Sequence, residues 1–203
     1  MKWLYLVLSV VILGAFALAF LVTRIENAQS LANKQLLLYE PMNQATDSTT
    51  AVVVFSRSGN TGVLADHIAN KTSGDLYEIT ADTYQLGIPG WISALKDARS
   101  NVADITPSQI DLSQYKTVYL GSPIWLYSPA PPIWQFVKDN DLTGKHVVLV
   151  NSFNSKFEQS FIDDFAELVK AQGAVSFTHK YVKRGRMGNQ LTTAQMLEKY
   201  DQQ

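Results

Sequence analysis

The strongest constraint on the fold is a continuous apolar run, Ala51-Val52-Val53-Val54-Phe55, that leads directly into a loop rich in serine and glycine. A short apolar run rich in β-branched residues predicts a strand that is buried on both faces, which is typical of a parallel sheet. Residues 60–71 follow, with Leu64 and Ile68 at helical spacing. A buried strand, a polar loop and a helix in this order indicate the first unit of an α/β sheet.

The same alternation continues to the end of the chain. Further strands are predicted at 75–80, 117–121, 147–150 and 175–182, and further helices at 91–102, at 133–138, around 161–169 and at 192–200. Strands that alternate with helices in this way predict an open, doubly wound sheet of five parallel strands. Ligands of such sheets bind beyond the carboxyl ends of the strands. We therefore expect the site in the loops after the first, third and fourth strands.

The amino terminus carries no charge from Trp3 to Val22. About 20 apolar residues suffice for a helix to cross a bilayer, so this run predicts a membrane-spanning anchor. A cleaved secretory signal is the alternative, favoured by Lys2 and by the small pair Ala17 and Ala19, although the apolar core of a signal is usually only ~7–15 residues long. We assign residues 1–24 to a single-pass anchor, 25–50 to a linker with a possible short helical piece, and 51–203 to the folded domain.

The charge distribution restricts the partners that the chain can bind but leaves its membrane orientation open. The 17 Lys and Arg nearly balance the 18 Asp and Glu, so there is no basic field to hold a nucleic acid, and no nucleic-acid partner is expected. Lys2 on one side of the span is matched by Arg24 and Lys34 on the other, which leaves open the side of the membrane that holds the domain. The absence of cysteine excludes disulfides, iron–sulfur ligation and thiolate chemistry. The three histidines lack metal-ligand spacing, so no metal site is proposed.

The loop after the first strand is Ser56-Arg57-Ser58-Gly59-Asn60-Thr61. It combines hydroxyl groups, a flexible glycine and the free amides of a helix amino terminus, which together favour an anion such as phosphate. The alternative is that these residues only cap the helix. The loop lacks the Gly-Lys-Ser/Thr of a nucleotide P-loop and the G-x-G-x-x-G of a dinucleotide site. A phosphate-bearing ligand of another kind is therefore the preferred interpretation.

The loop after the third strand contains Ser122-Pro123-Ile124-Trp125-Leu126-Tyr127 and several further prolines. Aromatic side chains in a stiff loop at the ligand edge suit a flat ring system, because stacking rewards planar overlap. The alternative is that Trp125 and Tyr127 only cover the sheet or fill the core. In combination with the first loop, this loop favours a ligand with a phosphate and a flat ring.

From about Ala51 to Tyr200 the chain resembles the flavodoxin family, in particular its NAD(P)H-oxidoreductase-like branch. Two stretches carry the resemblance, Val54-Phe55-Ser56-Arg57-Ser58-Gly59-Asn60-Thr61 and Leu120-Gly121-Ser122-Pro123-Ile124-Trp125 with the prolines that follow. The resemblance implies a flavodoxin-like sheet of strand order 2-1-3-4-5 and an FMN cofactor. It also implies that Ser56, Ser58, Asn60 and Thr61 hold the phosphate, and that Pro123, Ile124 and Trp125 line the flavin ring.

The loop after the fourth strand departs from the family pattern. Relatives usually have a glycine-rich turn where this chain has Asn151-Ser152-Phe153-Asn154. Without glycine the backbone loses access to positive φ, although asparagine tolerates the left-handed region. Phe153 could stack on a ring or obstruct it. The complete predicted cofactor set is Ser56, Arg57, Ser58, Gly59, Asn60, Thr61, Ser122, Pro123, Ile124, Trp125, Tyr127, Asn151 and Phe153.

Three functions are compatible with these motifs. The first is an FMN enzyme that takes hydride from NAD(P)H and passes electrons to a quinone-like or other acceptor. The second is an electron carrier that docks to a protein redox partner and has no substrate of its own. The third is a degenerate, flavin-free interaction domain. The first two need the same FMN pocket, so the motifs do not separate them, and a membrane anchor would serve both.

Overall fold

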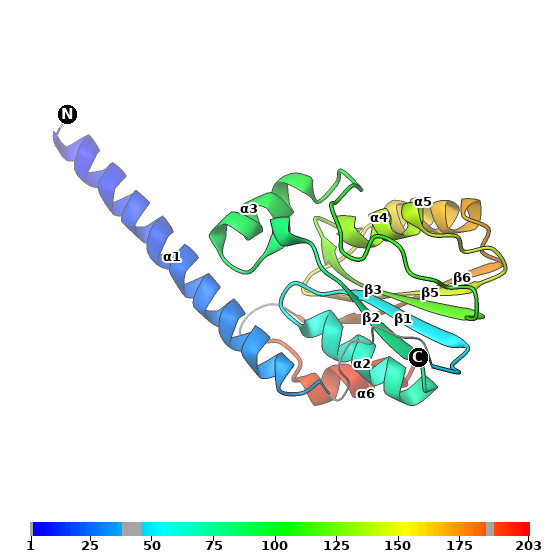
Figure 1. Cartoon of the computed structure of the whole chain (residues 1–203). Coiled ribbons are helices and arrows are strands. Elements are labelled where there is room, and N and C mark those ends of the chain that lie inside the picture. The colour runs from blue at the N-terminus through cyan, green and yellow to red at the C-terminus, as the bar shows by residue number, and fades with distance from the viewer. Residues whose placement is uncertain (1, 38–45, 186–188) are drawn as a thin grey trace.

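The computed structural model describes residues 2–37, 46–185 and 189–203, drawn in Figure 1. Residues 38–45 of the predicted linker, and residues 186–188 after the last strand, lie outside the described residues. The helices are α1 (Lys2–Lys34), α2 (Asn60–Thr72), the 3-10 turn η1 (Asp82–Tyr84), α3 (Ile88–Asp97), α4 (Pro131–Asp139), α5 (Gln159–Ala171) and α6 (Thr193–Asp201). The strands are β1 (Thr50–Phe55), β2 (Asp75–Ile79), β3 (Thr117–Trp125), β4 (Ser128–Pro129), β5 (His146–Phe153) and β6 (Ser176–Lys183).

The sheet has the strand order β2-β1-β3-β5-β6, and all four pairings along this path are parallel. The short β4 lies off the path and pairs antiparallel with the end of β3. The five long strands therefore follow the predicted order 2-1-3-4-5, which confirms the predicted fold. Strand order reverses between β1 and β3, and this reversal is where a doubly wound sheet binds its ligand.

Each face of the sheet is covered by helices, as Figure 1 shows. Residues of β1 alternate between the two faces because successive side chains of a strand point in opposite directions. Val52 and Val54 pack with residues of α2 and α6, whereas Val53 and Phe55 pack in the larger core with residues of α3, α4 and α5. All four of these β1 side chains are buried, as the apolar run predicted.

Strands β3 and β5 extend further than their apolar runs indicate, and α3 begins earlier. The parallel ladder continues past Gly121 through the pairs Ser122↔Asn151 and Pro123↔Ser152. Backbone pairing does not require apolar side chains, so the polar Ser122, Asn151 and Ser152 stay in the sheet. The earlier start of α3, at Ile88, agrees with the preference of proline for the first turn of a helix, where Pro89 lies.

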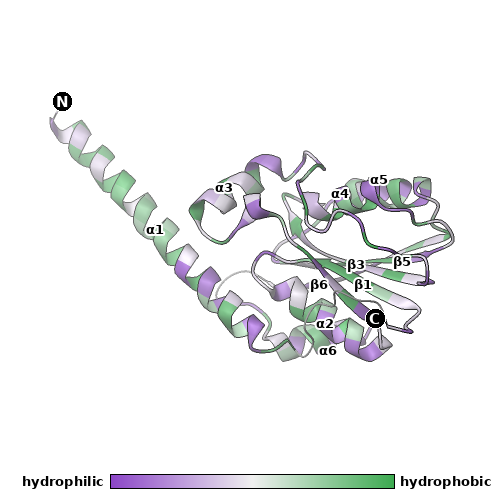
Figure 2. Ribbon diagram, viewed as in Figure 1, coloured by the Kyte–Doolittle hydropathy of each residue, from purple (hydrophilic) through white to green (hydrophobic). Residues whose placement is uncertain are grey.

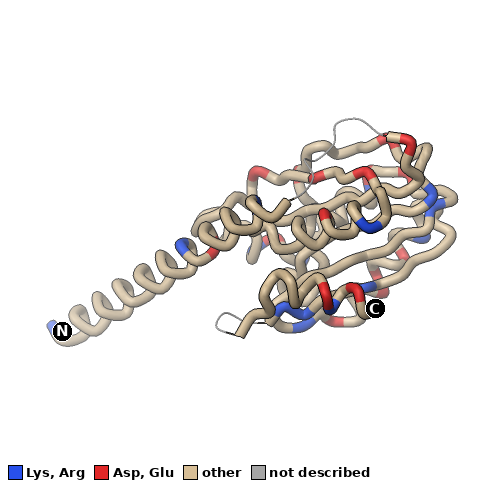
Figure 3. Tube along the Cα trace, turned by 90° about the horizontal axis from the view of Figure 1, so that it is seen from below, with Lys and Arg blue, Asp and Glu red and all other residues tan. Residues whose placement is uncertain are grey.

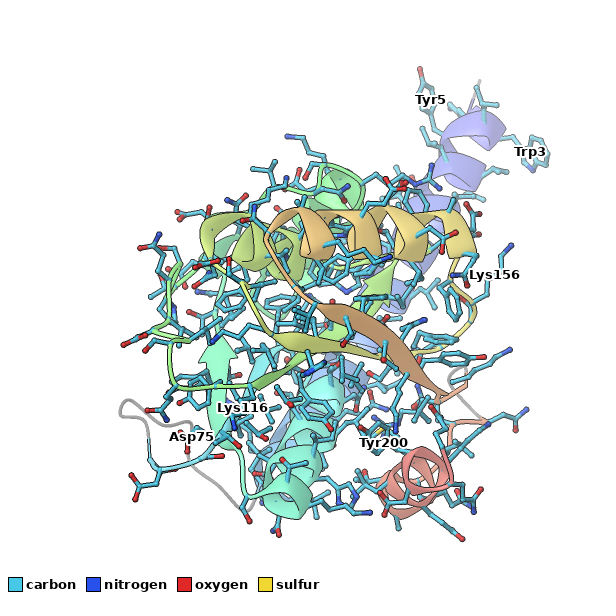
Figure 4. The ribbon with its side chains drawn as sticks, turned by 90° about the vertical axis from the view of Figure 1, so that its right-hand side faces the viewer. Trp3, Tyr5, Asp75, Lys116, Lys156 and Tyr200 are labelled. Atoms are coloured by element: carbon cyan, nitrogen blue, oxygen red, sulfur yellow. The ribbon has the colours of Figure 1, made fainter. Side chains whose placement is uncertain are left out.

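Helix α1 is continuous for 33 residues and runs through residues 25–34, inside the stretch that the sequence assigns to a linker. Its outer part is exposed and apolar (Figure 2), and it bears no Lys, Arg, Asp or Glu between Lys2 and Arg24 (Figure 3). Trp3 and Tyr5 lie at its far end, away from the sheet (Figure 4). By length and composition α1 is able to cross a membrane, a test that a signal sequence also passes. The boundaries 1–24, 25–50 and 51–203 stay a prediction.

Gly121 sets the spacing between β1 and β3. A Cβ atom at this position would lie 2.8 Å from Cγ2 of Val54, closer than real side chains approach. We expect Gly121→Ala to lower the free energy of unfolding by about 1–3 kcal/mol through overpacking. Adding Val54→Ala creates room, so the double variant should lose less than the sum of the two single losses, measured by urea denaturation.

Gly62→Ala is the matched control. The added Cβ would lie 3.6 Å from Cβ of Ser56 in ordinary contact, and alanine favours a helix over glycine. Its stability should be unchanged or slightly raised. Strict additivity of the Gly121 and Val54 losses would contradict the steric explanation.

Candidate functional site

The loop between β1 and α2 presents backbone N–H groups to the carboxyl edge of the sheet. Gly59 precedes α2 with φ at 84°, in the left-handed region that glycine adopts without strain, and no side chain caps the helix. The first amides of α2, beginning at Asn60, have no partner within the helix because an α-helix leaves its first N–H groups free. The capping alternative therefore does not account for this loop. Free amides and the helix dipole make it suited to an anion.

A cavity of about 270 Å³ lies beyond the carboxyl ends of β1, β3 and β5. It is the place where the predicted residues of all three loops meet. The predicted residues that line it are Ser56, Arg57, Ser58, Asn60, Thr61, Pro123, Ile124, Trp125 and Phe153. The loops are also joined directly, since the hydroxyl oxygens of Thr61 and Ser152 lie 2.8 Å apart.

The remaining predicted residues lie beside or beneath this cavity. Asn151 and Ser122 are fully buried, and the Asn151 side-chain amide donates to the Ser122 carbonyl at 2.8 Å, so they hold the ends of β3 and β5 together. Gly59 lines a second cavity on the α1 side. Tyr127 lines a neighbouring hollow, where Nζ of Lys156 lies 4.8 Å from the centre of its ring. Direct cofactor contacts of these four residues stay a prediction.

Two aromatic groups stand at the carboxyl ends of β3 and β5. Trp125 packs edge-on against Phe55 and Tyr84, with ring centres 5.5 Å and 5.2 Å apart. Phe153 packs against Phe157 and Tyr181 at 5.5 Å and 5.6 Å. Packing against these neighbours, edge-to-face in all pairs except the tilted Phe153–Tyr181 pair, fixes the orientation of the two rings. Phe153 therefore forms part of the cavity wall, in a position set by its neighbours.

Arg57 lines the cavity, yet its guanidinium is already occupied. Nε donates to the Tyr84 carbonyl at 3.1 Å, and Nη2 donates to the carbonyls of Gln85 and Gly87 at 3.2 Å and 3.1 Å. Nη1 forms an ion pair with Glu26 of α1. The side chain therefore joins the loop to the turn before α3 and to α1. A phosphate contact of Arg57 stays a prediction.

Arg184, directly after β6, lines the cavity but is not in the predicted cofactor set. Its residue exposure is 8%, and Nε donates to the Leu191 carbonyl at 3.3 Å. Nη1 has no hydrogen-bond partner among the residues that the structure describes. Burial lowers the pKa of this guanidinium, because a low-dielectric surrounding disfavours its charge. A buried cationic donor without a partner indicates a place for an acceptor, preferably an anion.

His179 lies on β6 behind the third loop. Its Nε2 is 2.9 Å from the side-chain oxygen of Asn151, whose amide nitrogen already donates to the Ser122 carbonyl. Nε2 is therefore the donor of this bond. Burial lowers the pKa of His179 to about 4, so the ring is neutral at pH 7. The neutral ring fixes the orientation of Asn151 and, through it, the end of β3.

Helix α1 reaches the site with its last turns. Glu26 lines the cavity, and the side chains of Ser30 and Asn33 are buried against the domain. The Asn33 amide nitrogen donates to the Ser58 carbonyl at 2.9 Å and to the Asn60 side-chain oxygen at 2.7 Å. The amino-terminal helix is thus a structural part of the first loop.

Other lining residues outside the predicted cofactor set are Glu26, Trp91, Ser152, Asn154 and Ser155. The last three lie in the same loop as the predicted Phe153, so extending that prediction by neighbouring positions would have included them. Glu26 and Trp91 come from α1 and α3 and carry no local signal.

The family model described as flavodoxin matches residues 49–202. The chain belongs to the flavodoxin family. The match covers the whole sheet with helices α2–α6 and leaves out α1. No protein among the curated sequences matches this flavodoxin.

Solved structures show the same fold at low sequence identity. A protein from Bacteroides uniformis, assigned as a flavoprotein, superposes with a TM-score of 0.58 at 20% identity, over 76% of this chain and 96% of that chain. A flavoprotein from Lactobacillus acidophilus in complex with FMN gives a TM-score of 0.54 at 20% identity, over 66% and 93%. A third, from Bacteroides eggerthii, gives 0.56 at 18%, over 76% and 96%.

Removing the Asn33 amide should loosen the first loop. Asn33→Ala keeps the Cβ that lies against Gly59 and deletes both hydrogen bonds of the amide. At about 1 kcal/mol for each of the two bonds, hydrogen–deuterium exchange of the peptide that spans residues 56–64 should accelerate up to about thirtyfold. Asn27→Ala, on the exposed side of the same helix, is the control and should leave the exchange unchanged. Equal exchange in both variants would contradict a role for Asn33 in holding the loop.

The pKa of His179 predicts a loss of stability in mild acid. The histidine pKa is lowered from 6.5 to about 4 in the folded state, so the unfolded chain binds a proton first as the pH falls. This stabilisation is present above pH 6.5 and declines towards pH 4. Between pH 7 and 5.5 the decline should be at most about 1 kcal/mol, reduced by the partial exposure of the ring. Urea denaturation of His179→Gln should show a flatter pH profile than wild type, and parallel profiles would refute this assignment.

Proposed function

We propose that this protein is an FMN-binding redox protein that α1 tethers to a membrane, and that it accepts reducing equivalents from NAD(P)H and delivers them to a quinone-like acceptor. One observation carries the cofactor assignment. A helix amino terminus with free amides, an aromatic wall and a buried arginine donor without a partner all border one cavity at the carboxyl edge of the sheet. Membership of the flavodoxin family and the FMN complex of the Lactobacillus acidophilus protein support the same cofactor.

The residues divide the binding task by their chemistry. Ser56, Ser58 and Thr61, with the first amides of α2, would hold the phosphate through hydrogen bonds from hydroxyl and N–H donors. Trp125 and Phe153 would border the ring. Flavin supplies the hydride and electron chemistry when it is bound, so no side chain has to act as an acid or base in the redox step.

Arg184 is placed to donate to a second hydrogen-bond acceptor group of the cofactor, away from the phosphate. It lies on the β6 side of the cavity, whereas the phosphate loop follows β1, and β3 and β5 lie between these two strands. We therefore assign Arg184 to the ring end of FMN, where a cation stabilises negative charge that develops on reduction. Burial strengthens this interaction because little water screens it.

The cofactor assignment is tested on the full-length chain in detergent. Apo protein titrated with FMN should quench flavin fluorescence and give a bound flavin spectrum. Arg184→Gln should weaken FMN binding about tenfold or more, because it removes a buried charge-assisted donor. Lys183→Gln removes an adjacent exposed charge and should bind like wild type. If no bound-flavin spectrum appears after FMN is added, the result would support the flavin-free interaction domain instead.

The donor is tested separately on the FMN-loaded protein. Rapid bleaching of the flavin band by NADH or NADPH alone, followed by reoxidation with a short-chain quinone, is the result expected for the enzyme. If neither nicotinamide bleaches the band while a chemical reductant does, the protein is an electron carrier for a protein partner. This outcome would overturn the oxidoreductase proposal and leave the cofactor assignment in place.

A further inference from the structure

Helix α3 exposes an apolar stripe that the fold does not use. Ile88, Trp91, Ile92 and Leu95 are all exposed, and their spacing places them on one side of the helix. Trp91 is 50% exposed and Ile92 is 55% exposed. The opposite side of α3, with Gly90 and Ala94, is buried against the domain. Contiguous exposed apolar surface of this kind marks a contact with a partner or with lipid.

The stripe faces helix α1. A groove of about 370 Å³ lies between the two helices, with Ile88, Trp91 and Ile92 on one wall. The other wall consists of residues of α1 that belong mostly to its uncharged run: Ala15, Leu18, Ala19, Val22, Thr23 and Glu26. Figure 1 shows α3 on the side of the domain that faces the middle of α1. Helix α3 therefore lies beside the segment predicted to lie in the membrane.

Helix geometry gives the depth of this contact. At 1.5 Å per residue, the run from Trp3 to Val22 spans roughly 30 Å, the thickness of the hydrocarbon core. Ala15 and Val22 are then separated by about 10 Å along the helix axis, at the end of the span nearest the domain. Amphipathic helices that lie in a membrane surface sit ~5–10 Å deep. The α1 wall of the groove thus places α3 at the depth that such helices occupy.

We propose that α3 is a second membrane contact, which buries its stripe of Ile88, Trp91, Ile92 and Leu95 among the lipid acyl chains of the leaflet next to the domain. This inference rests on the proposed insertion of α1. The groove between α1 and α3 is then filled by lipid hydrocarbon. The exposed side chain of Lys96, near the end of α3, would then lie within reach of lipid headgroups, which attract cations. Trp91 is of the residue type enriched at membrane interfaces.

The groove and the cofactor cavity share two lining residues, Glu26 and Trp91. Lipid in the groove is therefore separated from the cavity by a single layer of side chains. The charge of Glu26 at this boundary is compensated by its ion pair with Arg57. A hydrophobic electron acceptor could approach the cavity from the bilayer itself.

The chain has no cysteine, so a single introduced cysteine can carry a nitroxide label without further changes. Three full-length variants are compared in phospholipid vesicles: Ile92→Cys on the stripe, Leu13→Cys within the span, and Val175→Cys as a matched control. Val175 is also an exposed apolar residue, at 62% exposure, but it precedes β6 at the opposite end of that strand from the cavity. Collision of each label with oxygen, which concentrates in lipid, and with a water-soluble nickel chelate is read by electron paramagnetic resonance.

The label at position 92 should collide severalfold more with oxygen than with the nickel chelate, as the label at position 13 does. The label at position 175 should favour the nickel chelate. If the label at position 92 behaves like that at position 175 while the label at position 13 is in lipid, α3 does not contact the membrane. The proposed insertion of α1 is then kept and the proposal for α3 is overturned. If position 13 is also accessible to nickel, the anchor itself is wrong, and the membrane contact of α3 with it. Leu95→Cys repeats the measurement at a second stripe position, and normal circular dichroism confirms that each variant is folded.

Discussion

The parallel pairing of β1 with β3, and of β3 with β5, is the interaction on which the rest of the structure depends. Parallel strands end at the same edge of a sheet, so this pairing brings three loops that are far apart in the sequence to one place. The close approach at Gly121 fixes the spacing of two of these strands. Bonds across the ladder ends, such as that from Asn151 to Ser122, extend the same order into the loops. The cavity is therefore a product of the sheet more than of any single loop.

Helix α1 adds a second constraint, from outside the part of the chain that matches the family model. The family match begins at residue 49, after α1 has ended. Nevertheless, Asn33 holds the first loop and Glu26 pairs with Arg57 at the cavity wall. The helix that we propose as a membrane anchor thus also contributes to the geometry of the site. The first loop and α1 are joined by these contacts, so a displacement of α1 would also displace the loop.

Local sequence determines much of this fold and explains why it could be predicted. The run at 51–55 is apolar on both faces, and residues 60–71 have helical spacing, so each segment specifies its own structure. The boundaries were less accurate where backbone pairing extends past the apolar residues, as in β3 beyond Gly121. The loops that meet at the cavity followed from the expected topology alone.

The details of the site depend on contacts between distant segments, and no local pattern encodes them. Arg184, after β6, and Trp91, on α3, line the cavity because of where these elements pack in the folded domain. Arginine is a residue type that often binds anions, yet the guanidinium of Arg57 donates to backbone carbonyls and pairs with Glu26. Position in the sequence predicts which loop a residue belongs to, whereas the direction of its side chain is decided by the neighbours it meets.

The unbroken course of α1 has a mechanical consequence. From Val22, at the end of the predicted span, to Asn33, at the first loop, the helix rises only about 17 Å and contains no hinge. A flexible tether would let the domain occupy a wide volume. This short, continuous helix instead holds the domain at a nearly fixed distance from the predicted span. If α1 spans a bilayer as proposed, any tilt of the helix turns the domain with it, so membrane thickness and composition would affect the direction in which the cavity faces.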